Sequence, residues 1–139
     1  MTRRSLAGIT AALVIATGGM AIAAEAASAK TTLKTRIEVD SVLLNSAGQY
    51  EVSGKLLSKS PACRFRRVVS LHVVHPDNTD TIADIQKTKS GVGLFTVRAA
   101  LASGEGLFVT VAARNLTLKS GKRLHCATGR TTPIYPVPA

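Results

Sequence analysis

The sequence predicts an all-β domain, an antiparallel β-sandwich of about seven short strands. From residue 33 onward apolar and polar residues alternate with a period of two, which is typical of strands that bury one face. Turn signals rich in glycine, proline, asparagine and serine recur roughly every 8–15 residues. No segment after residue 30 carries a sustained helical apolar stripe, so the sequence favours packed sheets.

The first two strands are predicted at residues 33–40 and 50–56. In each, apolar or small side chains at every second position alternate with charged or polar ones, which indicates one buried face. The turn between them is Asn-Ser-Ala-Gly at residues 45–48, residue types that tolerate the backbone angles of tight turns. A polar loop containing Pro61 follows the second strand.

The third strand is predicted to be the longest and to begin at Cys63. Its odd-numbered positions share one face, so that Phe65 and Arg67 are expected to point inward with the valines and leucine that follow. Pro76 ends this strand, because proline removes a ladder donor and restricts the residue before it. Further strands, separated by polar turns, are predicted at residues 81–86, 95–101, 107–113 and 124–132.

Residues 1–29 differ in kind from the rest and are predicted to be a signal peptide. Two arginines near the start precede an alanine-rich apolar stretch, and Ala27-Ser28-Ala29 offers a cleavage site before Lys30. An uncleaved membrane anchor and cleavage after Ala24 are the alternatives. The adjacent arginines are compatible with either general secretory or twin-arginine export, and the short signal indicates a bacterial source. Both routes lead to a secreted or cell-surface protein.

The expected domain organisation is a signal peptide (1–29), a β-sandwich domain (30–132) and a proline-rich C-terminal tail (133–139). Of the 18 basic and 8 acidic side chains, the signal peptide holds two arginines and one glutamate, which leaves 16 and 7 in the mature chain, a net charge of +9. Such a charge favours anionic partners through long-range, salt-sensitive attraction, although a solvated surface also explains it.

Cys63 and Cys126 are predicted to form a disulfide, because an even cysteine count in an exported domain indicates one. In the chain-entropy model, closing so long a loop contributes about 4 kcal/mol to stability. A metal-thiolate site would need further cysteines or histidines at short spacing, and only His125 is adjacent.

Metal binding and catalysis have weak support in the sequence. The histidines are His72, His75 and His125, and the first two are three residues apart, which places them on opposite faces of a regular strand. Carboxylates in and around one loop, with Asn78, have the spacing of calcium ligands, and a polar turn explains them equally well. These carboxylates are Asp77, Asp80 and Asp84. No nucleophile elbow is present, so neither catalysis nor a cofactor is expected.

The densest positive charge lies at residues 64–67. Arg64 and Arg66 would share one face of the predicted third strand and, with Lys55 on a neighbouring strand, form an anion-binding ladder. Arginines on exposed strands also discourage edge-to-edge aggregation, which is the alternative explanation. Nucleic acid is not an expected partner, because the chain has two tyrosines, three phenylalanines and no tryptophan from which to build a stacking platform.

The stretch Cys63-x-x-x-Arg67-x-Val69-x-Leu71, a glycine-bearing turn before Leu94-Phe95-Thr96-Val97, and Cys126 near the end resemble a group of secreted bacterial β-sandwich modules. These are the immunoglobulin-like or carboxypeptidase-regulatory-like domains. The chain departs from their pattern where Arg66 replaces a glycine that often precedes the arginine, and where Lys89-Ser90 replaces an acidic residue. The resemblance implies an immunoglobulin-like sandwich that serves as a non-catalytic binding or spacer module.

The sequence therefore favours a monomeric, non-catalytic binding or structural module at or outside the cell surface, with no membrane span after signal cleavage. Its expected partner is an anionic surface polymer or another envelope protein. Two alternatives remain open: a secreted cationic effector, toxin or inhibitor that acts on anionic envelope components, and a small extracytoplasmic hydrolase or metal-dependent enzyme.

Overall fold

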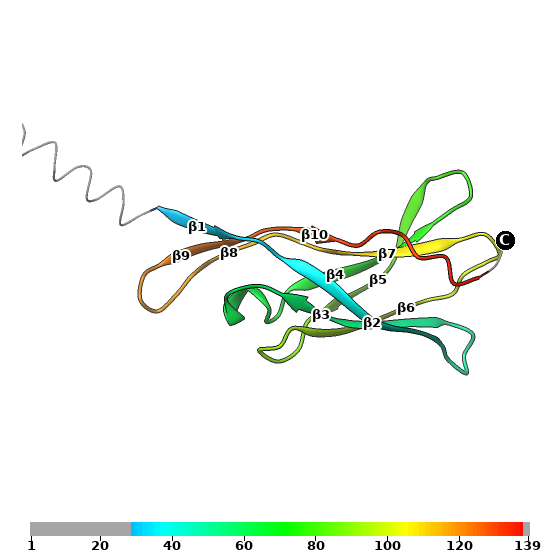
Figure 1. The fold of residues 1–139 in the computed structure, drawn as a ribbon, viewed down its shortest axis with the longest axis horizontal. Coiled ribbons are helices and arrows are strands. Elements are labelled where there is room, and N and C mark those ends of the chain that lie inside the picture. Colours follow the sequence, from blue (N-terminus) through cyan, green and yellow to red (C-terminus); the bar gives the residue numbers. More distant parts are fainter. Residues whose placement is uncertain (1–28, 138–139) are drawn as a thin grey trace, which may run out of the picture. The chain divides into compact units, whose positions relative to one another are not determined.

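The computed structural model describes residues 29–137. The predicted signal peptide therefore lies outside the described residues, apart from Ala29. The described chain is all-β, as predicted. It has ten strands, where about seven were predicted, and one short 3-10 helix (Figure 1). They are β1 (Lys30–Leu33), β2 (Arg36–Leu44), β3 (Tyr50–Leu57), η2 (Pro61–Cys63), β4 (Val68–Val74), β5 (Asp80–Lys87), β6 (Leu94–Ala99), β7 (Gly106–Val111), β8 (Arg114–Thr117), β9 (Arg123–Cys126) and β10 (Gly129–Arg130).

The described residues divide into a large unit, residues 32–115 with 125–137, and a small unit, residues 29–31 with 116–124. The large unit contains a three-stranded sheet of order β2-β3-β6 and a four-stranded sheet of order β10-β7-β4-β5. Every pairing within these two sheets is antiparallel. A third sheet has the order β1-β9-β8. In the small unit, the backbones of Leu118 and Lys122 pair around a turn at Gly121.

One hydrophobic core lies between the two sheets of the large unit, which makes them a β-sandwich. Alternate residues of β3 and β6 face alternate residues of β4 and β7, as the period-two pattern predicts. Each fully buried valine or leucine contributes roughly 1.5–3 kcal/mol. The core members are Val52, Leu56, Val69, Leu71, Val73, Phe95, Val97, Ala99, Leu107, Val109 and Val111.

The predicted start of the third strand is wrong, because β4 begins at Val68 and not at Cys63. Ser60 caps η2 through its side chain and Pro61 occupies the first helical turn, so this segment turns instead of extending. Phe65, predicted to point inward, is 43% exposed, whereas Arg67 is buried as predicted. Arg64 and Arg66 consequently do not share a strand face.

The predicted last strand is divided into β9 and β10, and pairing continues beyond it. Ile134 and Leu107 exchange two backbone hydrogen bonds of 2.8 Å, and Ile134 packs against the core. The domain boundary at residue 132 stays a prediction. Within residues 29–137 no helix is long and apolar enough to cross a membrane.

Candidate anion-binding site

The predicted disulfide is confirmed: Cys63 is bonded to Cys126, and the two Cα atoms lie 5.4 Å apart. Both cysteines are fully buried. The bond joins the end of η2 to the end of β9, segments separated by 63 positions in the sequence. Such a crosslink is consistent with an oxidising, extracytoplasmic environment.

Arg67 is a fully buried cation held by hydrogen bonds to uncharged groups. Its Nη1 donates to the carbonyl of Cys63 at 2.6 Å and to the hydroxyl of Thr35 at 3.2 Å. Its Nη2 donates to the carbonyls of Ala112 and Ala127 at 2.7 and 2.8 Å. Burial lowers the pKa of Arg67, and the nearby charge of Arg114 lowers it further. These contacts give Arg67 a structural role, because they tie four chain segments together.

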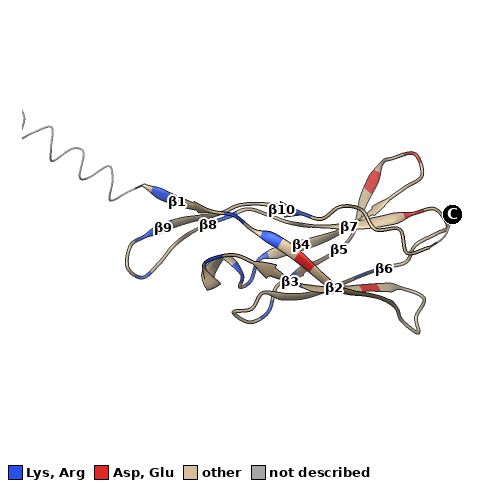
Figure 2. Cartoon of the chain, viewed as in Figure 1, with Lys and Arg blue, Asp and Glu red and all other residues tan. Residues whose placement is uncertain are grey.

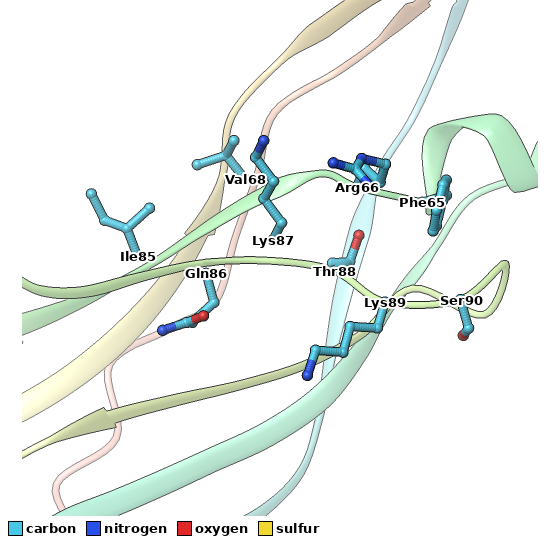
Figure 3. A pocket seen from close by; sticks show the side chains of 9 residues that line it. All are labelled: Phe65, Arg66, Val68, Ile85, Gln86, Lys87, Thr88, Lys89 and Ser90. Atoms are coloured by element: carbon cyan, nitrogen blue, oxygen red, sulfur yellow. The ribbon is translucent and has the colours of Figure 1, made fainter.

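Arg64 and Arg66 line different hollows on either side of this turn. The Arg64 hollow has a volume of about 660 Å³ and is lined by Thr32, Leu33, Lys34, Arg36, Leu57, Ser58, Lys59 and Arg64. The Arg66 hollow has a volume of about 560 Å³ and is lined by Phe65, Arg66, Val68, Ile85, Gln86, Lys87, Thr88, Lys89 and Ser90 (Figure 3). The predicted ladder of Arg64, Arg66 and Lys55 is therefore not formed, because Lys55 lines neither hollow and pairs with Glu38 at 3.2 Å.

In the Arg66 hollow the side chains point to two sides of β5. Figure 3 shows Lys87 and Arg66 on the same side as Val68 and Ile85, and Gln86 and Lys89 on the other. The alternation of β5 explains the opposite directions of Gln86 and Lys87, and Val68 pairs in register with Lys87. Phe65 and Ile85 are 43% and 55% exposed, so apolar surface lies beside the cations.

Arg114 extends the positive charge from the Arg66 hollow. Its Nη1 donates to the carbonyl of Phe65 at 2.9 Å. An adjoining hollow of about 290 Å³ is lined by Arg66, Lys87 and Arg114 among others. Arg66 and Lys87 thus line both hollows, and the smaller hollow is also lined by Arg67 and Arg114.

The backbone of Arg66 is in the left-handed region, with φ of 54°. A residue with a Cβ adopts this region at a cost of about 1–2 kcal/mol, whereas glycine adopts it freely. The backbone is held there by hydrogen bonds of Arg66 and Arg67 to the carbonyl and hydroxyl of Thr88. The chain therefore keeps an arginine side chain at a position that favours glycine.

Within the described chain, the carboxylates that form ion pairs do so away from these hollows. The four pairs are Lys55–Glu38, Arg98–Glu51, His72–Asp80 and His75–Glu105. No aspartate or glutamate lines either hollow. Figure 2 shows the acidic segments on β2, at the β4–β5 hairpin and at other loops. The hollows therefore retain positive charge that no carboxylate neutralises at short range.

The structure does not bring the three histidines together. His72 Nδ1 lies 2.8 Å from Asp80 Oδ2, and its Nε2 lies 3.0 Å from Thr110 Oγ1. His75 repeats this arrangement with Glu105 Oε2 at 2.7 Å and Thr81 Oγ1 at 3.1 Å. His125 is hydrogen-bonded to Asn115 at 2.6 Å.

The carboxylates that were candidate calcium ligands also have separate partners. Asp77 accepts hydrogen bonds from the backbone and hydroxyl of Thr79, which lower its pKa. Asp84 accepts from the backbone of Arg98 at 2.8 Å, and Asp80 pairs with His72. Among residues 29–137, no group of three or more His, Cys, Asp or Glu side chains is placed to hold a metal ion.

Sequence reasoning missed most of the cations that line the hollows. Lys34, Arg36 and Lys59 join Arg64, and Lys87 and Lys89 join Arg66, from segments distant in the sequence. The Ser60-Pro61 pair is a helix-start signal that predicts the break before β4. Comparisons of the chain with protein-family models, curated proteins and solved structures found no match.

Proposed function

We propose that this protein is an exported, non-catalytic β-sandwich module that binds an anionic polymer of the cell surface through the Arg64 and Arg66 hollows. The observation that carries the proposal is that the cations of both hollows lack carboxylate partners among residues 29–137, whereas Lys55 and Arg98 on other surfaces are paired. Unpaired cations around a hollow attract anions over long range and bind them in a salt-sensitive way.

The Arg66 hollow suits a polymer that is both anionic and partly apolar. Exposed Phe65 and Ile85 offer apolar contact beside Arg66 and Lys87. An anionic glycan combines the apolar faces of its sugar rings with charged groups, so it matches this surface better than a uniformly charged chain. We therefore favour an anionic wall polysaccharide.

The left-handed backbone of Arg66 supports a binding role for its side chain. Strained backbone persists where the surrounding structure holds it, and such positions cluster at functional sites. If the side chain served only stability, glycine at this position would relieve the strain. An arginine retained there is explained by an anionic ligand.

The proposal is tested by retention of the mature protein on polyphosphate and heparin columns. Arg66→Gly with Lys87→Gln is compared with Lys55→Gln and Arg98→Gln, a matched pair that also removes two positive charges. We expect the first variant to elute at markedly lower salt and to melt no lower than the wild type, since it also removes strain. Equal shifts in both variants would show that only net charge matters and would overturn the proposal.

A hydrolytic function is the second candidate, and the contacts of His72 favour it. A carboxylate, an imidazole and a hydroxyl lie in hydrogen-bonded order, the order of a general-base relay. Thr110, however, is β-branched and sits within the regular strand β7, whereas hydroxyl nucleophiles commonly occupy strained turns. The repetition at His75 also favours a structural role. Hydrolysis of p-nitrophenyl acetate that is lost in Thr110→Val and kept in Thr81→Val would support this second candidate.

A further inference from the structure

We infer that the Arg64 hollow is a specific subsite for a tetrahedral oxyanion ester, a phosphate or sulfate group attached to a carbon skeleton. The inference rests on the proposed function and makes it more specific: the Arg64 hollow would bind the charged group of the polymer. The inference is carried by two side-chain atoms of residues that line the hollow, Ser58 Oγ and Arg64 Nε. Both are buried, and neither has a hydrogen-bond partner among the described residues.

Buried donors without a partner are rare in folded proteins, because burial removes water and nothing replaces it. Ser58 and Arg64 line the same hollow, and each carries one of these unpartnered donors. An oxyanion that enters beside them would supply acceptors to both at once. The Arg66 hollow has no such buried atom within the described chain.

The backbone fixes Arg64 at the wall of the hollow. Its carbonyl accepts a hydrogen bond from the hydroxyl of Thr88 at 2.6 Å. Gly93, with φ of 78°, packs so closely that an added Cβ would lie 2.9 Å from the same carbonyl oxygen and 3.0 Å from Arg64 Cβ. Arg64 is half-buried and forms none of the four ion pairs. The backbone and Cβ of Arg64 are therefore held in place before a ligand arrives, which reduces the entropy lost on binding.

Three exposed cations line the hollow together with Arg64. Arg36 pairs in register with Leu57 at the end of the β2–β3 ladder, next to Ser58. Lys34, Arg36 and Lys59 are exposed, so their long side chains can close over an anion. The hollow is thus lined by two residues that carry unpartnered donors and by three exposed cations with long side chains.

The donor set favours a tetrahedral oxyanion over a carboxylate. The Nε–H and Nη–H edge of an arginine binds two oxygens of one anion, which a carboxylate satisfies fully. A phosphate or sulfate ester has at least one further oxygen that can accept from Ser58. The hollow is also larger than a single oxyanion, at about 660 Å³, and Leu33 and Leu57 provide apolar wall for the carbon skeleton.

The test follows the Arg64 Nε–H signal by NMR while the mature protein is titrated at constant ionic strength. The probes are glycerol 3-phosphate, a sulfated monosaccharide, inorganic phosphate and acetate. We expect saturable shifts with both esters, weaker binding of inorganic phosphate, and at least tenfold weaker binding of acetate. Inorganic phosphate binding as tightly as the esters would overturn the ester assignment, and acetate binding equally well would overturn the oxyanion subsite.

Matched variants separate the subsite from general charge. Arg64→Lys keeps the charge but removes Nε–H, and Ser58→Ala removes the hydroxyl. Each variant should bind the esters about tenfold more weakly or worse, because it loses a charge-assisted or directional hydrogen bond. Arg98→Lys, the same change at an arginine that pairs with Glu51 and lines neither hollow, should leave ester binding unchanged. Equal losses for Arg64→Lys and Arg98→Lys would overturn the inference. Ester binding by a protein that polyphosphate and heparin columns do not retain would overturn the proposed polymer function and leave the subsite standing.

Discussion

The guanidinium of Arg67 donates a hydrogen bond to the carbonyl oxygen of Cys63 at 2.6 Å, so the buried cation is bound directly to a disulfide-bonded residue. The four-residue spacing of Cys63 and Arg67 allows this contact because η2 and the turn after it fold the chain back. The same guanidinium reaches Thr35, Ala112 and Ala127. A covalent bond and a buried cation therefore fix the same end of the sandwich.

Replacement of Arg67 by methionine is expected to lower the free energy of unfolding by about 3 kcal/mol or more, because carbonyls that it satisfies lose their donor in a buried site. Lysine should restore little of this loss, since an ammonium group cannot reproduce the planar fork that serves four acceptors. Urea denaturation measures both variants. A methionine variant as stable as the wild type would show that water satisfies these carbonyls.

Loss of the disulfide is expected to lower stability by about 4 kcal/mol, the chain-entropy value for a loop of this length. The protein should show no free thiol under denaturing conditions, and reduction should lower its melting temperature. Replacement of Cys63 and Cys126 by serine should reproduce reduction, and chelators should have no effect. A melting temperature that responds to chelator and not to reductant would contradict this account.

Glu105 is expected to make stability depend on pH in the acid range. Its carboxylate accepts a hydrogen bond from the backbone of Ala102 and contacts His75, and both contacts lower its pKa below the ordinary 4.5. Because the folded-state pKa lies below the unfolded one, this contribution is present above the unfolded pKa and is lost as pH falls through the folded pKa. As the pH is lowered from about 6 to about 3, the free energy of unfolding should therefore fall less for Glu105→Gln than for the wild type.

The control for Glu105 is Asp40→Asn, which removes an exposed carboxylate from β2. Thermal unfolding across the pH range compares the three proteins. Parallel pH profiles for Glu105→Gln and the wild type would show that other carboxylates, such as Glu51 and Asp77, whose pKa values are also lowered, account for the acid sensitivity.

Two glycines of one turn should respond differently to alanine. Gly93 has φ of 78° and an added Cβ would lie 2.9 Å from the carbonyl oxygen of Arg64, so Gly93→Ala should destabilise the domain by about 2 kcal/mol or more. At Gly91 an added Cβ meets nothing within 4 Å, so Gly91→Ala should change stability by less than about 1 kcal/mol. Equal melting temperatures for the two variants would contradict this difference.

The sequence by itself determined the fold class and the disulfide. Alternation in segments such as Val69–Val73 and Phe95–Ala99 reports burial directly, because successive side chains of a strand point to opposite faces. Two cysteines leave a single intramolecular pairing. The alternation lies within single segments, and two cysteines allow only one pairing. Both features therefore follow from the sequence without reference to the tertiary packing.

Only the tertiary structure decided where the cations lie. Alternation continued through residues 63–67, but the cap at Ser60 and the left-handed Arg66 turn this segment and send Arg64 and Arg66 to different hollows. The Arg64 hollow needs residues 32–36, 57–59 and 64 to meet, and sheet pairing and the turn bring them together. The sequence positions of the cations do not predict which of them will lie together, because an exposed cation is equally stable on many surfaces. Their grouping is therefore a consequence of how the sheets pack and where the chain turns.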